Sequence, residues 1–223
     1  MTVRLLALFS AAAMLACAET DAGKRLQAAA QAFKEVMDVP DKTIPQDLLN
    51  KAHCIVIIPG LKTGAFIVGG KYGKGFVACR KNDGVGWTAP ASVRVEGGSF
   101  GFQIGGTSTD LFMLVMNDSG MNRLLSTKFT LGGDASAAAG PVGREAQAQT
   151  DAAMTAEILT WSRAKGLFAG ISLQGATLRP DEDWNKELYG RDVTNREILT
   201  GSIAPPAAAA ALEANLNKYS SRK

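Results

Sequence analysis

Glycine is the residue that most restricts how this chain can fold. The sequence has 223 residues and 24 glycines, and 18 of these lie between Gly60 and Gly143. Apolar and aromatic residues are interleaved with them throughout, which excludes a flexible linker. Glycine inside strands marks bulges, tight bends or close backbone approaches. The middle of the chain is therefore expected to form a strongly curved, largely antiparallel sheet that is barrel-like in outline.

A short pattern occurs twice in this region, as GGKYG at residues 69–73 and as GGSFG at residues 97–101. Neither copy has the spacing of a dinucleotide-binding or Walker loop. Both fit strands that bend. We therefore assign these glycines to the curved sheet rather than to a phosphate-binding loop.

The hydrophobic period predicts which segments are strands and which are helices. Helical patterns lie at both ends of the sequence and strand patterns lie between them, which makes the fold class α+β. Residues 152–161 fit a helix, or else the first strand of a hairpin that turns at residues 164–166. Expected strands are residues 54–58, 65–70, 75–80, 87–95, 99–104, 111–116 and 129–138.

Helix boundaries are indicated by capping residues. A helix is expected over residues 22–38, and Thr43 resembles the first residue of a capping box before a second helix. Asn117 and Asp181 are expected to cap two further helices, and Gly190 is expected to end the latter. Thr194 and Glu197 form another capping box, and an alanine-rich helix is expected to follow residues 205–206 and reach about Tyr219.

Residues 1–18 read as a targeting segment rather than as part of the fold. Arg4 precedes an apolar run over residues 5–15, which is too short to span a membrane. Residues 16–18 fit cleavage before Glu19, whereas Cys17 alternatively fits the lipidated residue of a lipoprotein. Both alternatives predict export to the periplasm, with residues 19–223 forming one domain that ends in a short helical tail.

Export affects what is expected of the other two cysteines. Cys54 and Cys79 lie in apolar, strand-like segments and would meet an oxidising compartment. A disulfide between them and a pair of buried free thiols are both compatible with these surroundings.

Charge and motifs argue against several functions. The 24 Lys+Arg and 21 Asp+Glu give a net charge of +3, too small to indicate nucleic-acid binding. Residues 97–101 match the G-x-S-x-G nucleophile motif, in which the histidine of the catalytic triad follows the serine in the sequence. The only histidine here, His53, precedes the motif. S-x-x-K and K-T-G, two motifs of serine β-lactamases, both occur, but in the reverse of the order found in those enzymes. We therefore expect no catalytic residue, no metal site and no cofactor.

A series of short motifs runs in order along most of the chain. Its positions are Gly70, Gly73 and Gly75; Trp87, Ala89 and Pro90; Gly98, residues 101–105 (GFQIG) and Asp110; Leu131, Gly132, Asp134 and Ala135; residues 139–144 (AGPVGR); residues 162–170 (SRAKGLFAG, except Ala164); and residues 188–190 (LYG). Together these positions resemble the SYLF domain family of lipid-binding proteins, and the resemblance covers about residues 25–200.

The resemblance implies a non-catalytic domain that binds phospholipid headgroups at an anionic membrane surface. Eukaryotic members bind phosphoinositide membranes and some bind actin, but an exported chain would not meet actin. The family's amphipathic membrane helix corresponds to residues 22–38. Candidate headgroup contacts are Lys24, Arg25, Arg144, Arg163 and Lys165.

Two alternatives weigh against this assignment. The apolar face of the helix over residues 22–38 fits a protein core at least as well as a membrane, and each candidate cation could instead form a structural ion pair. The corresponding alternative function is a periplasmic scaffold that binds an envelope protein and makes no direct contact with lipid.

Overall fold

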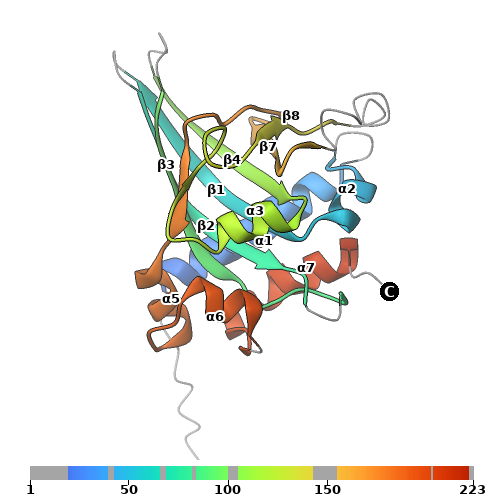
Figure 1. Ribbon diagram of the computed structural model, residues 1–223, viewed down its shortest axis with the longest axis vertical. Coiled ribbons are helices and arrows are strands. Elements are labelled where there is room, and N and C mark those ends of the chain that lie inside the picture. Colours follow the sequence, from blue (N-terminus) through green and yellow to red (C-terminus); the bar gives the residue numbers. More distant parts are fainter. Residues whose placement is uncertain are drawn as a thin grey trace, which may run out of the picture.

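The computed structural model describes residues 20–39, 43–65, 69–81, 84–99, 105–142, 155–201 and 203–220. Its central element is a nine-stranded sheet with the order β5-β9-β3-β2-β1-β4-β7-β6, in which β8 pairs with β7. The β6–β7 pair is parallel, and the pairs among β1, β2, β3 and β4 are antiparallel. The sheet curls into a half-barrel, and helices precede and follow it (Figure 1). The expected α+β fold is confirmed.

The strands are β1 (Cys54–Ala65), β2 (Gly69–Cys79), β3 (Ala91–Ser99), β4 (Gly105–Val115), β5 (Phe129–Thr130), β6 (Ala137–Ala139), β7 (Ile158–Ala164), β8 (Leu167–Gly170) and β9 (Thr177–Pro180). The helices are α1 (Asp21–Met37), α2 (Gln46–Lys51), α3 (Asp118–Leu124), α5 (Glu182–Tyr189), α6 (Asn195–Thr200), the short 3-10 helix η2 (Ala207–Ala209) and α7 (Ala210–Ser220).

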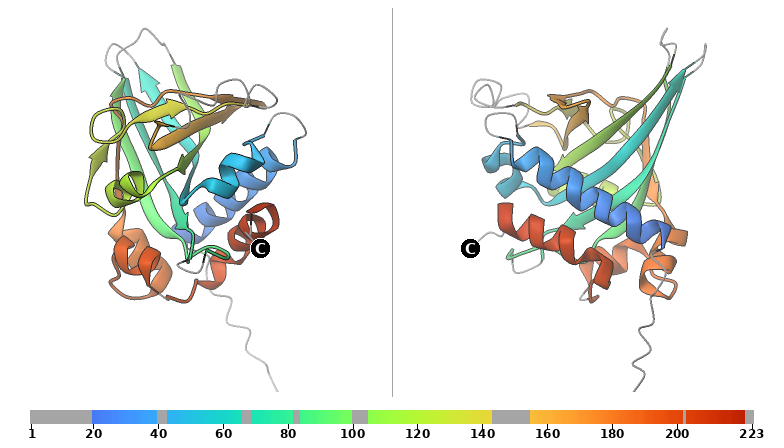
Figure 2. Two further views of the ribbon diagram at one scale, coloured as in Figure 1. Left: turned by 45° about the vertical axis from the view of Figure 1, so that its right-hand side comes forward. Right: turned by 180° about the vertical axis from the view of Figure 1, so that it is seen from behind.

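The two faces of the sheet bury two hydrophobic cores. On one face, alternate residues of β1, β2 and β4, such as Ile57 and Phe112, pack with α1, α2 and α7. On the other face, their neighbours, such as Val56 and Met113, pack with β5, β9 and α6 inside the curl. Figure 2 shows α1 and α7 side by side across the outer face, while the ends of β1 to β4 extend beyond them.

Strand β1 is longer than the sequence indicated. The expectation that it ends at Pro59-Gly60 is wrong, because the strand continues to Ala65. The register of β1 shifts between Ile57 and Lys62 against β2, and between Ile58 and Leu61 against β4. Gly60 has a φ of +61° within this irregularity. The Pro-Gly pair therefore forms a bulge inside one strand and does not end it.

Three other boundaries differ from expectation. The strand expected over residues 87–95 begins later, because β3 starts only at Ala91. The residue before it, Pro90, has no N–H to donate. The expected strand over residues 129–138 is split into β5 and β6 by a turn at Gly132, whose φ is +78°. Helix α2 begins after Pro45 without a side-chain cap, so the capping box expected at Thr43 is wrong.

Most helix termini agree with the sequence. Asn117 caps α3, Asp181 caps α5, and Gly190 ends α5 in the left-handed conformation. Thr194 and Glu197 form a complete capping box on α6. The ambiguous region is resolved as a hairpin between β7 and β8, as one of the two alternatives predicted. The strands expected at residues 65–70 and 99–104 fall partly outside the described residues.

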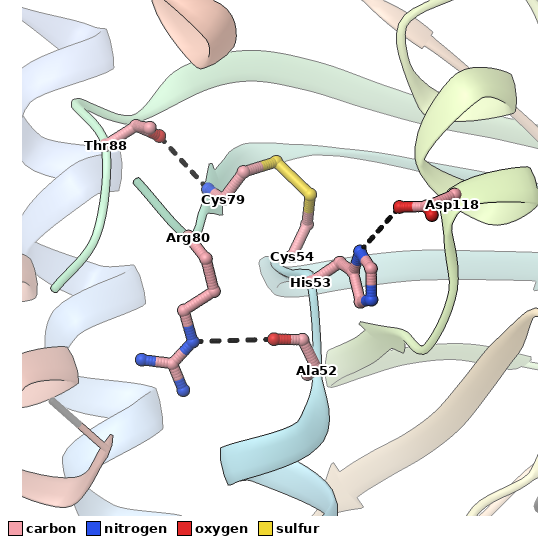
Figure 3. Close-up of a disulfide and its surroundings, with 7 residues drawn as sticks. All are labelled: Ala52, His53, Cys54, Cys79, Arg80, Thr88 and Asp118. Carbon is pink, nitrogen blue, oxygen red and sulfur yellow. Dashed lines mark hydrogen bonds and ion pairs between the residues drawn. A yellow bond between two sulfur atoms is a disulfide. The ribbon is translucent and has the colours of Figure 1, made fainter. Parts of the chain in front are cut away.

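Cys54 and Cys79 form a disulfide that joins β1 to β2. The two residues are direct partners in the strand register and are fully buried. Neighbouring His53 points the other way and places Nδ1 3.2 Å from Oδ1 of Asp118, the first residue of α3 (Figure 3). The alternative of two free thiols is thereby excluded.

Candidate functional site

Helix α1 occupies the position in which the resemblance implies a membrane helix. The Thr20 hydroxyl accepts a hydrogen bond of 3.0 Å from the Gly23 amide and caps its start. Leu26, Ala29 and Phe33 on its apolar face are fully buried in the core. The apolar face of α1 is therefore core, and only its polar face is exposed.

That polar face borders a shallow groove of about 750 Å³, which α1 forms with the alanine-rich segment of η2 and α7. Lys24 and Lys34 lie along the groove. Lys34 Nζ is 2.7 Å from Asp38, and the hydrogen bond from Lys34 lowers the pKa of the Asp38 carboxyl to about 2. Lys24 Nζ lies 3.8 Å from Asp21. Both ammonium groups thus have an acidic neighbour on their own helix.

Arg25 and Arg163 are held within the protein. Arg25 Nη1 donates a hydrogen bond of 2.7 Å to the Pro59 carbonyl in the β1 bulge. Arg163 of β7 donates to Asp110 of β4 from Nε at 3.0 Å and from Nη2 at 2.6 Å. It also pairs with Glu35 of α1. The two arginines therefore connect α1 and β7 to the centre of the sheet.

These contacts change the ionisation of the groups involved. The hydrogen bond from Arg163 lowers the pKa of the Glu35 carboxyl. Burial lowers the pKa of Arg163 itself, but its hydrogen bonds to Glu35 and Asp110 outweigh burial and raise the pKa overall. The pair of Arg163 and Glu35 thus stabilises the charged form of both partners.

Lys165 lies at the tip of the β7–β8 hairpin, with a left-handed φ of 47°. Leu167 follows it and is 74% exposed, the most exposed large apolar side chain of the described residues. Lys165 was expected from the sequence to contact lipid and Leu167 was not, although both lie in one family motif. Arg144 and Cys17, with the whole expected targeting segment, lie outside the described residues.

A pocket of about 470 Å³ lies near the disulfide end of β2. It is bordered by Lys81, Thr88 and Glu213. Burial raises the pKa of the Glu213 carboxyl. In the described part of the chain, no three His, Cys, Asp or Glu side chains are grouped to hold a metal ion. No helix within the same residues is long and apolar enough to cross a bilayer.

Comparison with known proteins identifies the family. The Ysc84 profile, described as "Las17-binding protein actin regulator", matches residues 96–219, from β3 to α7. The chain belongs to the Ysc84 family. The SYLF resemblance drawn from the glycine motifs is therefore confirmed.

Relatives in this family are similar over most of the chain. It is 39% identical over 180 residues to the SH3 domain-containing protein PJ696.02 of Schizosaccharomyces pombe, covering 79% of this chain and 41% of that protein. It is 37% identical over 172 residues to LAS seventeen-binding protein 3 of Saccharomyces cerevisiae (strain ATCC 204508 / S288c), covering 75% of this chain and 37% of that protein.

A mammalian relative is similar over a longer stretch. The chain is 33% identical over 184 residues to the SH3 domain-containing YSC84-like protein 1 of Rattus norvegicus, covering 82% of this chain and 54% of that protein. The chain thus spans from about two fifths to about half the length of these Ysc84-family relatives. These relatives are named as SH3 domain-containing or LAS seventeen-binding proteins.

Proposed function

We propose that this Ysc84-family chain is an exported, non-catalytic domain that binds the headgroup surface of anionic phospholipid membranes. The observation that carries the proposal is the β7–β8 tip, where Leu167 is exposed beside Lys165. An exposed apolar side chain two residues from a cation at a hairpin tip suits the bilayer interface, where the cation meets phosphate and the apolar group enters the acyl boundary.

Export to the periplasm, with or without an acyl chain on Cys17, is part of this proposal. One acyl chain alone holds a protein weakly, so a second contact from the folded domain would make attachment stable. Under this proposal the partner is lipid, and actin, named for the family profile, is not expected.

Vesicle flotation tests the proposal. The Cys17→Ser protein, which cannot be acylated, is mixed with vesicles of phosphatidylcholine alone or of equal parts phosphatidylcholine and phosphatidylglycerol. We expect flotation only with the anionic vesicles, weakened by salt and by Leu167→Asp. Absence of flotation with both vesicle types would exclude direct lipid binding by the folded domain.

A second candidate function is a scaffold that binds an envelope protein. The groove between α1 and α7 favours it, because its alanine floor admits a helix from another protein. Ala211→Arg would fill the groove. If that variant alone lost a cross-linked partner while vesicle flotation was unchanged, the scaffold would be supported as a separate activity.

A further inference from the structure

Four glycines form a row across the free end of the sheet. The strand register pairs Gly98 of β3 with Gly70 of β2, Gly70 with Gly64 of β1, and Gly64 with Gly106 of β4. Residues 69–71 of the GGKYG repeat thus pair with residues 97–99 of the GGSFG repeat on the adjacent strand. The disulfide is at the other end of β1 and β2. The strand ends away from the disulfide, to which the register assigns these glycines, project beyond the helices (Figure 2).

At three of these four positions, Gly64, Gly70 and Gly98, no contact among the described residues requires glycine. A Cβ atom added at Gly64, Gly70 or Gly98 would meet no atom within 4 Å, and none of the three has a left-handed φ. Gly75, further along β2, differs, since its Cβ would collide with the Ile57 carbonyl. Glycine in an exposed strand lowers stability. Contacts among the described residues therefore give no reason for glycine at these three positions.

The residues beside the row are basic and aromatic. Lys62 and Tyr72 are partners two register rows away from Gly64 and Gly70, and Tyr72 is 48% exposed. Lys71 lies between Tyr72 and Gly70 on β2. Within the described ranges, neither lysine has a carboxylate within 4.0 Å. The nearby Glu96, the partner of Tyr72 on β3, is already paired with Arg179 at 2.8 Å.

The β7–β8 tip is at the same end of the sheet. Strand β7 runs antiparallel to β4 and pairs Arg163 with Asp110, so its turn at Lys165 points toward the end where β4 begins. Exposed Leu167 follows that turn. The segments that connect the central strands at this end, residues 66–68 and 100–104, contain no charged residue in the sequence.

We propose that this end of the sheet, formed by the glycine row with Lys62, Lys71 and Tyr72, is the surface that docks on the anionic bilayer. The inference rests on the proposed function and names its contact surface. Unpaired lysines meet lipid phosphates, and tyrosine is favoured at the membrane–water interface. A row without side chains makes the sheet end thin, so it displaces few headgroups when it enters between them.

The same strands set a limit to the depth of docking. Among the described residues, β3 pairs with β9 only at residues 93–96, and β4 pairs with β7 only at residues 110–115. The outer edges of β3 and β4 near the glycine row thus have no ladder partner. Unpaired backbone groups are excluded from hydrocarbon. The sheet end therefore reaches the headgroup layer, where water and phosphate can satisfy those groups.

Helix α1 is the alternative contact surface. Two double variants with the same change in net charge distinguish α1 from the sheet end. We expect Lys62→Glu/Lys71→Glu to weaken binding of the Cys17→Ser protein to the phosphatidylglycerol vesicles by about tenfold or more, given the contribution of each basic residue near an anionic surface. Lys24→Glu/Lys34→Glu should bind as the parent does.

Glycine substitution tests the thin sheet end directly. Gly70→Thr/Gly98→Thr adds side chains in open space and favours strand conformation, so we expect the melting temperature to rise while vesicle binding falls. A raised melting temperature shows that lost binding does not come from unfolding. Undiminished binding of this stabilised variant would overturn the role of the glycine row.

The outcomes separate the two proposals. If the parent protein floats and only the α1 variant loses binding, or both variants lose it equally, the sheet end is not the docking surface and lipid binding stands. If the parent protein does not float with anionic vesicles, the proposed function itself fails.

Discussion

Asp110 and Arg163 face each other across β4 and β7, and the carboxylate accepts two hydrogen bonds from the guanidinium. The other carboxylate oxygen accepts a bond of 2.9 Å from the Gly60 amide. One acidic side chain thus joins β7 to the bulge of β1. Arg163, which the resemblance offered as a lipid contact, has a structural partner instead.

Removing this carboxylate should destabilise the fold. The side chains of Asp110 and Arg163 are only 19% and 22% exposed, so Asp110→Ala leaves a partly buried cation and amide without their acceptor. We expect a loss of about 2 kcal/mol in the free energy of unfolding, measured by urea denaturation. Asp192→Ala is the control, because its pair with Lys186 is mostly exposed and should matter little. Equal effects of both variants would refute the structural role of Asp110.

Stability should fall in acid partly through Glu35. Its folded-state pKa is lowered from 4.5 by the hydrogen bond from Arg163, so the unfolded chain takes up the proton first. The contribution of Glu35 is present above about pH 4.5 and is lost as pH falls through the folded-state pKa. Melting temperature measured against pH should show a shallower acid decline for Glu35→Gln. An unchanged decline would show that the pair with Arg163 does not stabilise the protein.

The pH dependence of stability that comes from Glu213 should be opposite in sign to that from Glu35. Burial raises its pKa, so its ionised form costs stability above the folded-state pKa and the cost disappears as pH falls through it. Glu213→Gln should therefore raise the melting temperature at neutral pH and leave it almost unchanged in acid. Lys81 beside it opposes the shift, which keeps the expected gain small. A lower melting temperature at neutral pH would instead indicate a needed pair with Lys81.

Substitution by alanine should change the free energy of unfolding differently at Gly140 and at Gly64. A Cβ at Gly140 would overlap the ring of Trp161, a fully buried side chain. We expect Gly140→Ala to lose about 1–3 kcal/mol or more, since a packed core does not admit an added group. Gly64→Ala is the matched control and should not be destabilising, because its Cβ meets nothing within 4 Å. Chemical denaturation of both variants measures the difference.

Features set by neighbouring residues could be predicted from the sequence. The capping box of Thr194 and Glu197, the left-handed Gly190 and the apolar face of α1 each depend on residues within a few positions. The bulge at Gly60 could not be predicted, because it is fixed by Asp110, which lies 50 positions away.

The candidate cations show the same limit. The sequence allows Arg163 to contact lipid or to form an ion pair, but it does not identify Asp110 and Glu35 as partners, because the fold brings them to Arg163 from distant segments. Lys62 and Lys71 give no signal in the sequence beyond their charge. Only the strand register places them beside the glycine row.

The disulfide between Cys54 and Cys79 should stabilise the folded protein. Cys54 and Cys79 are separated by 25 positions, and closing a loop of that size restricts the unfolded chain by about 3 kcal/mol on the chain-entropy model. Cys54→Ala/Cys79→Ala should therefore unfold at lower denaturant concentration, by about that free energy, and should be insensitive to reductant. The parent protein should move toward the double variant when the unfolded chain is reduced. If the double variant were as stable as the oxidised parent, the bond would contribute nothing beyond the β1–β2 pairing that already holds these residues opposite each other.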